Sequence, residues 1–394
     1  MSPKGFAVSA AAAREFEQGR TQVPLASIAI RDTLEPGQPL RILDPAGRPI
    51  GLGIADPEND CVRLLARAGE GVDAIDPAFV ARRVERAAAL RATLGLTGED
   101  RAYRLLNGSG DGLSGFTADV FGRWAVLHVY ARGLVSLGRQ VADAMRAHVN
   151  LRGVVIKVRS RGAASQGKIR QDIVGDAPPD TLTVLEEGVP FEVHLTTGLN
   201  VGLFTDMRVH RHGLATFVRG RSVLNGFCYT GSLSVVAARA GASAVTSVDL
   251  SAGVLNWARD NFVLSGLDPA LPIYRFAADD VGRYVANVVR DRRTYDVILL
   301  DPPTFSAARG ASFSIERDYA PLIASAASVV SPGGILWLAC NTREVSLTAM
   351  AQLGLERTER EGQVLETGGL PPDYPTVLGH PEERYLQIGV FRLA

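Results

Sequence analysis

The sequence contains few cysteines and no long apolar run. Its 394 residues include three cysteines, Cys61, Cys228 and Cys340, and no two of them form a C-x-x-C pair. Such scattered cysteines argue against a disulfide framework and against a zinc site. No apolar run reaches the ~18 residues of a membrane-spanning helix, and the first residues lack the pattern of a signal peptide. We therefore expect a soluble, cytoplasmic protein without a bound metal or a membrane partner.

Excess positive charge is also absent. The 42 lysines and arginines balance the 42 aspartates and glutamates, and only three of the cations are lysines. A neutral chain is not typical of a nucleic-acid-binding protein, so charge alone leaves a small-molecule substrate open. The length predicts more than one domain. We divide the chain into a small β domain (1–71), a middle α+β domain (72–188) and a larger α/β domain (189–394).

The most informative motif is Asp301-Pro302-Pro303-Thr304-Phe305, which directly follows the apolar run 297–300. Such a run is typical of a buried parallel strand, and the two prolines end it because proline cannot donate to the ladder. Asp301 is thereby predicted at the carboxyl end of a strand, where open α/β sheets bind their ligands. The same motif is also compatible with an ordinary exit from a strand into a loop.

A second set of motifs lies about 75 residues earlier. The predicted strand 222–227 is followed by a loop that contains Gly231, a helix over 232–239 and a second strand, 244–248, that ends at Asp249. This order is typical of a mononucleotide-binding βαβ unit, in which an acid at the end of the second strand accepts hydrogen bonds from a ribose diol. The loop lacks G-x-G-x-x-G, so a dinucleotide is not indicated. Ser251 is predicted to cap the next helix, and Asp279 is placed to meet an adenine amino group.

Two stretches, 151–171 and 207–248, are basic and free of acids. Most such stretches are solvated surfaces, but two that flank a predicted cofactor site favour contact with a phosphate backbone. The RNA-binding candidates of the first stretch are Lys157, Arg159, Arg161, Lys168 and Arg170.

Together these motifs resemble the RlmI/RlmK-like family of S-adenosylmethionine-dependent 23S rRNA methyltransferases. The segments that carry the resemblance are 110–115 (GDGLSG), 202–208 (GLFTDMR), 225–231 (NGFCYTG), 247–251 (SVDLS), 301–305 (DPPTF) and Cys340. The resemblance implies a PUA-like first domain, a middle domain that contacts RNA and a Rossmann-like class I methyltransferase domain with a mostly parallel, doubly wound sheet. It also implies 23S rRNA or a ribosomal precursor particle as partner and a homodimer.

The resemblance further implies a role for each matching residue. Asp206 and Arg208 would close over the methionine end of the cofactor, although Asp206 has the alternative of capping a helix over 207–216. The loop after the first predicted strand would be lined by Asn225, Phe227, Tyr229 and Gly231. The full set of cofactor-binding candidates is Asp206, Arg208, Asn225, Phe227, Tyr229, Gly231, Asp249, Ser251, Asp279 and Asp301.

The target base depends on Cys340, which follows the predicted strand 335–338. Cytosine C5 is too weakly nucleophilic to accept a methyl group until a thiolate adds to C6, so Cys340, with a lowered pKa and close to Asp301, is the predicted nucleophile. Its alternative is a small buried hydrophobic residue. Thr304 stands where RlmI-type enzymes usually have lysine. The RlmK type, which methylates guanine N7 without covalent catalysis, is resembled by the segments 256–261, 316–318 and 341–343. The segment 373–386 resembles the RlmI type, and we favour cytosine C5. A small-molecule methyltransferase and a non-catalytic RNA-binding protein stay as alternatives of another class.

Overall fold

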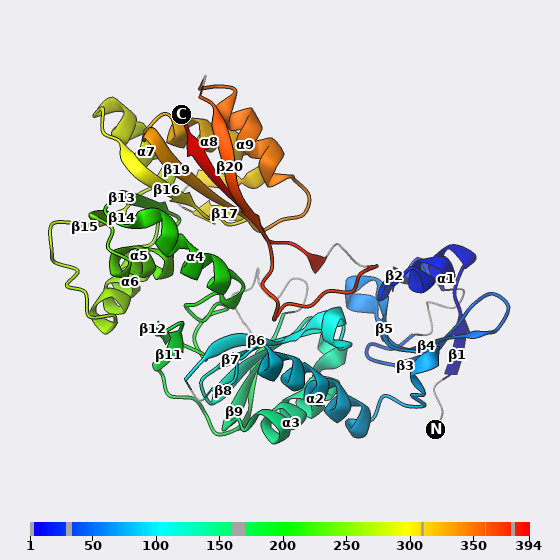
Figure 1. Ribbon diagram of the computed structural model, residues 1–394. Coiled ribbons are helices and arrows are strands. Elements are labelled where there is room, and N and C mark those ends of the chain that lie inside the picture. The colour runs from blue at the N-terminus through cyan, green and yellow to red at the C-terminus, as the bar shows by residue number, and fades with distance from the viewer. Residues whose placement is uncertain are drawn as a thin grey trace. The chain divides into compact units, whose positions relative to one another are not determined.

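The computed structural model describes residues 4–28, 34–98, 100–159, 170–308, 311–358, 360–379 and 383–394. The chain forms two compact units. Unit 1 contains residues 1–184, 193–201 and 372–383, and unit 2 contains residues 185–192, 202–371 and 384–394. The chain therefore passes from one unit to the other five times. Both units are mixtures of helices and strands (Figure 1).

Unit 2 is built on a seven-stranded sheet. In spatial order the first five strands and the last are parallel to one another, and the sixth strand runs antiparallel to its two neighbours. The strand order reverses between β13 and β16, which creates the topological switch point at which open α/β sheets bind ligands. In spatial order the strands are β15 (Tyr274–Ala278), β14 (Ala244–Asp249), β13 (Ser222–Gly226), β16 (Tyr295–Leu300), β19 (Val330–Cys340), β21 (Gln387–Leu393) and β20 (Gly362–Gly368).

Six helices pack on this sheet because its central strands are apolar on both sides. All four residues of the run 297–300 in β16 are buried, as a strand covered on both faces requires. The helices α7, α8 and α9 lie on one face and α4, α5 and α6 on the other (Figure 1). Their bounds are α4 (Arg208–Val218), α5 (Ser232–Arg239), α6 (Ala252–Leu264), α7 (Val281–Arg290), α8 (Ile315–Ala327) and α9 (Leu347–Leu355).

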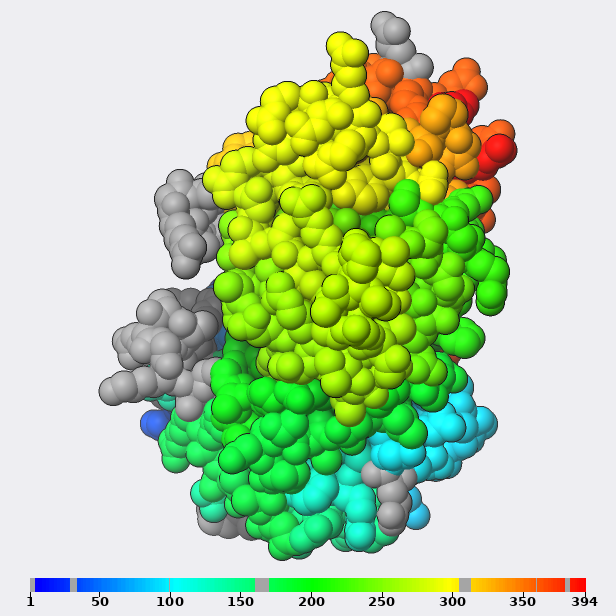
Figure 2. Space-filling model, turned by 90° about the vertical axis from the view of Figure 1, so that its left-hand side faces the viewer, coloured from blue at the N-terminus to red at the C-terminus, as the bar shows by residue number. Residues whose placement is uncertain are grey.

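The edge of the sheet at β15 is exposed. No described strand pairs with its free side, and the nearby side chain of Val263 is 62% exposed. Figure 2 shows this face of the molecule, where residues of the range 250–300, coloured yellow-green to yellow, form the surface. After β16 the chain forms the hairpin β17 (Phe305–Ala308) and β18 (Ala311–Ser314).

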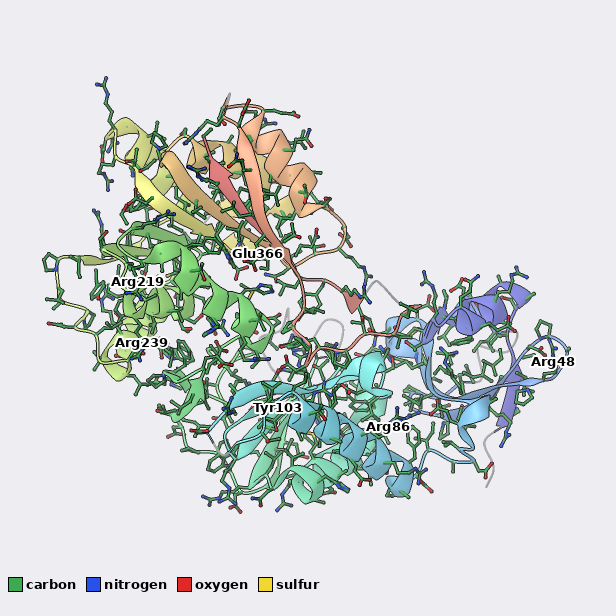
Figure 3. All side chains as sticks on the ribbon, viewed as in Figure 1. Arg48, Arg86, Tyr103, Arg219, Arg239 and Glu366 are labelled. Atoms are coloured by element: carbon green, nitrogen blue, oxygen red, sulfur yellow. The ribbon has the colours of Figure 1, made fainter. Side chains whose placement is uncertain are left out.

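Unit 1 contains two five-stranded sheets, each with an apolar cluster of its own. The first sheet carries the helix α1 (Ala10–Glu17), and the second carries α2 (Pro77–Thr93) and α3 (Val135–Val149). Strands β4 and β5 of the first sheet contribute apolar side chains to the core of the second. Tyr103 lies in that core (Figure 3), and its burial raises the pKa of the phenol to about 12.

The strands of unit 1 follow a different spatial order from their order along the chain. The first sheet has the order β1 (Lys4–Ala7), β3 (Pro39–Leu43), β4 (Pro49–Asp56), β5 (Cys61–Arg67) and β2 (Gln22–Pro24). The second sheet has the order β10 (Arg170–Gly175), β9 (Gly153–Val158), β8 (Trp124–Val129), β7 (Phe116–Phe121) and β6 (Ala102–Asn107). A small hairpin, β11 (Leu182–Glu186) and β12 (Val189–Val193), follows, and its residues 185–192 belong to unit 2.

The predicted α/β fold with its mostly parallel sheet is confirmed. The predicted helix over 232–239 is α5, and the predicted strand before Asp301 is β16. The division at residues 71 and 188, and the assignment of the first domain as PUA-like, stay predictions. In the part of the chain that the structure describes, no helix is both long and apolar enough to cross a bilayer.

Candidate active site

Two of the predicted acids, Asp249 and Asp301, and Cys340 lie where three strands end at the same edge of the sheet. The register pairs Gly226 of β13 with Val248 of β14 and with Leu300 of β16. Leu300 in turn pairs with Leu338 of β19. Because all these strands are parallel, Asp249, Asp301 and Cys340 lie at the carboxyl edge, on the two sides of the switch point. Unit 2 supplies all of them.

The loop between β13 and α5 has an unusual backbone. Phe227 and Tyr229 have positive φ angles of 59° and 48°, which are uncommon outside glycine and cluster at ligand-binding sites. Gly231 follows with φ 76°, and a Cβ there would lie 2.8 Å from Cβ of Ala258. The chain thus approaches α6 more closely than an alanine at 231 would allow.

Asp249 holds this loop in place. Its Oδ2 accepts a hydrogen bond from the backbone N of Tyr229 at 3.0 Å, and its Oδ1 accepts one from the backbone N of Ser251 at 3.0 Å. Each carboxylate oxygen retains a second lone pair, which is what a ribose diol requires. Ser251 caps α6 as predicted, because its Oγ accepts from the backbone N of Val254 at 3.4 Å.

Aromatic side chains line the loop. The ring of Tyr229 lies 5.4 Å from Phe204 and 6.4 Å from Trp257, measured between centroids, and Phe227 lies 5.4 Å from Phe313. Burial raises the pKa of Tyr229 to about 12, so the phenol is neutral. The loop therefore combines rigid apolar surfaces with the carboxylate of Asp249, a combination that suits an adenosine.

Three candidates have partners that the sequence did not indicate. Asn225 is fully buried and its Nδ2 donates to Oγ of Ser234 at 2.9 Å, while its Oδ1 has no hydrogen-bond partner among the described residues. The guanidinium of Arg208 lies 3.6 Å from the carboxylate of Glu187. Asp279 forms an ion pair with Arg283. Their predicted contacts with a cofactor stay predictions.

Asp301 and Asp206 form an acidic pair with two polar partners. Nδ2 of Asn341 donates to Oδ1 of Asp301 at 3.0 Å, and the Tyr385 hydroxyl donates to Oδ2 of Asp206 at 2.7 Å. Burial, together with the negative charge of Asp206, raises the pKa of Asp301 to about 7. Asp301 therefore exists in both protonation states near neutral pH. The alternative of Asp206 as a helix cap is wrong, because Met207 is the N-cap of α4 and makes no side-chain cap bond.

Cys340 lies beside Asp301, as predicted, but its thiol is not activated. The side chain is fully buried in an apolar cluster, and its Sγ donates to the carbonyl of Thr342 at 3.8 Å. Burial and the negative charge of Asp301 raise the pKa of the thiol, so the expected lowering of this pKa is wrong for the structure described. The hydroxyl of Tyr319 lies within 3.1 Å of the carbonyl of Leu300 and 2.8 Å of the carbonyl of Ala339, which ties the ends of β16 and β19 together.

The basic candidates belong to unit 1 and differ in exposure. Lys157 in β9 is fully buried, and its Nζ donates to the carbonyl of Gly198 at 3.0 Å; burial and Arg159 lower its pKa to about 8. Arg159 is partly buried and donates to Nδ1 of His128 at 3.0 Å. Arg170 is exposed, whereas Arg161 and Lys168 lie outside the described residues. A buried Lys157 does not present its charge to a phosphate.

Sequence reasoning gave no role to Asn341 or Tyr385. Asn341 directly follows Cys340, so the end of β19 could have indicated it. Tyr385 lies 179 residues from its partner Asp206, and only its place in the segment 373–386 drew attention to it.

The comparisons with known proteins identify the class. A family model described as S-adenosylmethionine-dependent methyltransferase matches residues 130–382, and the chain belongs to this family. The observed loop and the carboxylate of Asp249 fit S-adenosylmethionine, and the roles of Tyr229 and Asp249 at its adenosine half stay predictions. The predictions of an enzyme and of this cofactor are confirmed.

Named relatives place the chain more narrowly. It is 32% identical to ribosomal RNA large subunit methyltransferase I of Shewanella denitrificans over 86% of both chains, and 29% identical to the protein of the same name from Erwinia tasmaniensis over 90% of both. Among solved structures, a candidate SAM-dependent methyltransferase from Streptococcus mutans matches with a TM-score of 0.85, 24% identity and coverage of 98% and 99%. A candidate methyltransferase in complex with SAH matches with a TM-score of 0.87 at the same identity and coverage. These two structures support the fold.

Proposed function

We propose that this chain methylates a base of 23S rRNA in the cytoplasm, as naked RNA or in a ribosomal precursor particle, and that the base is cytosine, methylated at C5. The large-subunit rRNA substrate follows the names of the relatives. The observation that carries the choice of cytosine is the placement of Asp301 and Cys340 side by side at the ends of β16 and β19. The homodimer implied by the resemblance is an expectation that light scattering after size-exclusion chromatography tests.

The site supports this reaction through the two protonation states of Asp301. With a pKa of about 7, the carboxyl donates a hydrogen bond to cytosine N3 when protonated and accepts one from the N4 amino group when ionised. Asn341 fixes one carboxyl oxygen and leaves the other for the base. Bound S-adenosylmethionine supplies an electrophilic methyl group.

Cys340 would add to C6 of the cytosine as a thiolate, which makes C5 nucleophilic. After methyl transfer to C5, loss of the C5 proton and breakage of the bond between sulfur and C6 would release the methylated base and the thiolate. The raised pKa and full burial mean that the thiol must lose its proton and become accessible when the base binds. The buried thiol is also the observation that favours the second candidate, methylation of guanine N7. N7 is already a nucleophile and needs only positioning by Asp301 and Asn341.

Methyl transfer to 23S rRNA from a strain that lacks this protein tests the proposal. Labelled cofactor is used with the wild type, Cys340→Ala and the control Cys228→Ala, and the product nucleosides are analysed. Cys228 is a suitable control because it is also buried in unit 2 and burial raises its pKa. We expect 5-methylcytidine, a loss of at least about a thousandfold in Cys340→Ala, and activity in Cys228→Ala.

Two other outcomes of this experiment would refute parts of the proposal. Labelled 7-methylguanosine that survives Cys340→Ala would refute the cytosine proposal and make Cys340 a packing residue. Absence of label in RNA from wild-type protein would refute the rRNA proposal and favour a small-molecule substrate. Binding of S-adenosylmethionine by Cys340→Ala, measured by calorimetry, verifies that this variant is folded.

A further inference from the structure

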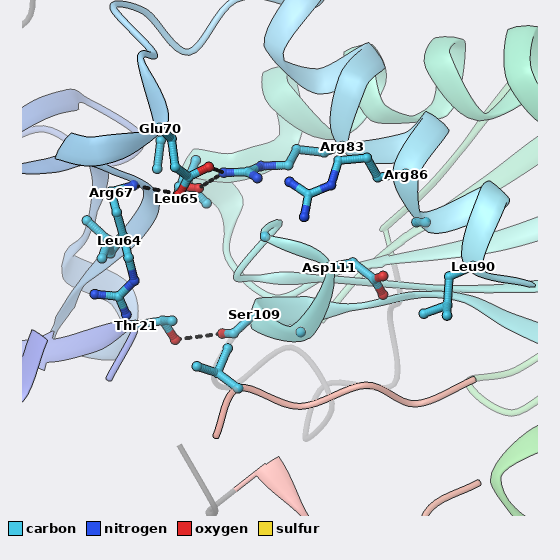
Figure 4. A pocket seen from close by; sticks show the side chains of 15 residues that line it. Thr21, Leu64, Leu65, Arg67, Glu70, Arg83, Arg86, Leu90, Ser109 and Asp111 are labelled. Carbon is cyan, nitrogen blue, oxygen red and sulfur yellow. Dashed lines mark hydrogen bonds and ion pairs between the residues drawn. The ribbon is translucent and has the colours of Figure 1, made fainter. Parts of the chain in front are cut away.

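Unit 1 contains a cavity of about 480 Å³ that the methyl-transfer site does not use (Figure 4). Its walls come from β5, from α2 and from the turn Gly108–Asp111 that follows β6. Its volume lies within the range of about 300–1,000 Å³ that is typical of ligand-binding pockets. The last two residues of this turn begin the GDGLSG segment at 110–115, which the catalytic site leaves without a role.

The walls of the cavity are held together before any ligand binds. Oγ1 of Thr21 donates to Oγ of Ser109 at 2.7 Å, and Nη2 of Arg83 donates to the carbonyl of Leu65 at 2.8 Å (Figure 4). Gly112 has φ 72°, and a Cβ there would lie 2.8 Å from Nε of Arg83, so glycine lets the turn pack on this side chain. Binding would therefore need little rearrangement of the walls.

The charge in the cavity is positive after its ion pairs are counted. Asp111 is neutralised by two contacts with buried Arg91, at 2.6 and 2.9 Å, and Glu70 pairs with Arg83 at 2.6 Å. The two remaining cations are Arg67 and Arg86. Among the described residues, the guanidinium of Arg67 donates to two backbone carbonyls, at 2.6 and 3.4 Å, and to no side chain.

Arg86 has no hydrogen bond or ion pair with any residue that the structure describes. It is exposed, and Figure 4 shows its guanidinium directed into the cavity. An unpaired guanidinium at the mouth of a preformed cavity is well suited to an anion such as a phosphodiester.

Apolar side chains also line the cavity. Leu64 and Ala87 are buried, while Leu90 and Val377 are partly exposed within the lining. A free phosphate would leave these side chains uncovered, whereas a base would bury them. The cavity thus offers cations for a phosphate, the hydroxyls of Thr21 and Ser109 for a ribose, and an apolar surface for a base.

We propose that this cavity binds one unstacked nucleotide of single-stranded RNA, with its phosphate on Arg86 and Arg67 and its base against Leu90 and Ala87. The guanidinium of Arg86 also provides a plane on which a base stacks. This inference deepens the proposed function and rests on its RNA substrate. It assigns the GDGLSG segment to RNA binding through the turn that forms the cavity floor.

Fluorescence anisotropy with a short labelled RNA of mixed sequence, single-stranded or annealed to its complement, tests the proposal. The variant is Arg86→Gln and the matched control is Arg82→Gln. Arg82 is exposed on the same helix, does not line the cavity and has no ion pair with a described residue, so both variants remove one equivalent charge. We expect wild type to prefer the single strand, about tenfold weaker binding in Arg86→Gln, and less than about a twofold change in Arg82→Gln.

Methyl transfer to 23S rRNA is measured on the same proteins. We expect Arg86→Gln to raise KM for the RNA with kcat unchanged, because the cavity contributes binding away from the reacting base. Equal losses in both variants, or unchanged affinity in Arg86→Gln, would overturn the cavity proposal even if rRNA is methylated. A tenfold loss confined to Arg86→Gln in a protein that leaves rRNA unmethylated would keep the cavity proposal and refute the proposed function.

Discussion

Asp301→Asn separates what this carboxyl contributes to catalysis from what it costs in stability. Burial and Asp206 raise its pKa from the usual 3.8 to about 7. Between these two values the folded protein holds a proton that the unfolded chain releases, so the free energy of unfolding falls as the pH rises through this window. At about 1.4 kcal/mol per pH unit, the full cost at pH 8 is about 4 kcal/mol.

Asparagine removes this cost because its amide carries no charge, and its Oδ1 still accepts from Asn341. We therefore expect Asp301→Asn to gain stability over the wild type as the pH rises, by about 3 kcal/mol between pH 5 and pH 8. Methyl transfer should be lost in the same variant, because the amide cannot exchange a proton with the base.

Urea unfolding at pH 5, 6, 7 and 8 measures the difference. Trp257 and Trp337 belong to unit 2, so in a Trp124→Phe background tryptophan fluorescence reports this unit. Asp206→Asn should lower the pKa of Asp301. The free energy of unfolding of this variant should therefore stop falling at a lower pH than that of the wild type. Asp260→Asn, at an exposed position of α6, is the control. An advantage of Asp301→Asn that is the same at all four pH values would refute this electrostatic explanation.

Two further predictions concern the frame of the site. Gly231→Ala should weaken S-adenosylmethionine binding by about 1–3 kcal/mol in calorimetry, because residue 231 has φ 76° and its new Cβ would meet Ala258. The control Gly266→Ala has a similar φ of 75° but no atom within 4 Å of its new Cβ, and it should bind the cofactor as the wild type does. Glu186→Gln should lower the free energy of unfolding by about 3–5 kcal/mol, because buried Arg211 contacts this carboxylate at 2.6 and 2.7 Å and would lose the negative charge that Glu186 supplies. The exposed neighbour in Glu187→Gln should cost less than about 1 kcal/mol, and similar losses in both glutamate variants would contradict the reasoning.

The strands and the acids at their ends could be predicted because local signals agree there. An apolar run that ends in Asp301-Pro302-Pro303 specifies a buried strand and its last residue, and parallel strands bring such ends to one edge. The cap at Ser251 was predictable for the same reason, since a helix start is encoded within three residues.

The contacts that tune the site could not be predicted, because they join distant segments. Nothing local to Asp206 indicates Tyr385, and nothing local to Arg208 indicates Glu187. Lys157 was misjudged for a different reason: its basic neighbours suggested a surface, whereas the apolar residues around it belong to the buried strand β9. The pKa of Cys340 likewise depends on the side chains that bury it, which a motif does not specify.

Because the chain passes repeatedly between the units, unit 1 cannot complete its fold early in synthesis. Residues 372–383 belong to unit 1, where the carbonyl of Asp373 accepts from Arg91 at 2.7 Å and its carboxylate accepts from the backbone N of Arg104 at 3.0 Å. Unit 1 therefore stays unfinished until residue 383 has left the ribosome, although its first 184 residues emerge much earlier. A chain that is truncated after residue 371 would lack the last strand of unit 2 and would also leave buried polar groups of unit 1 without their partners.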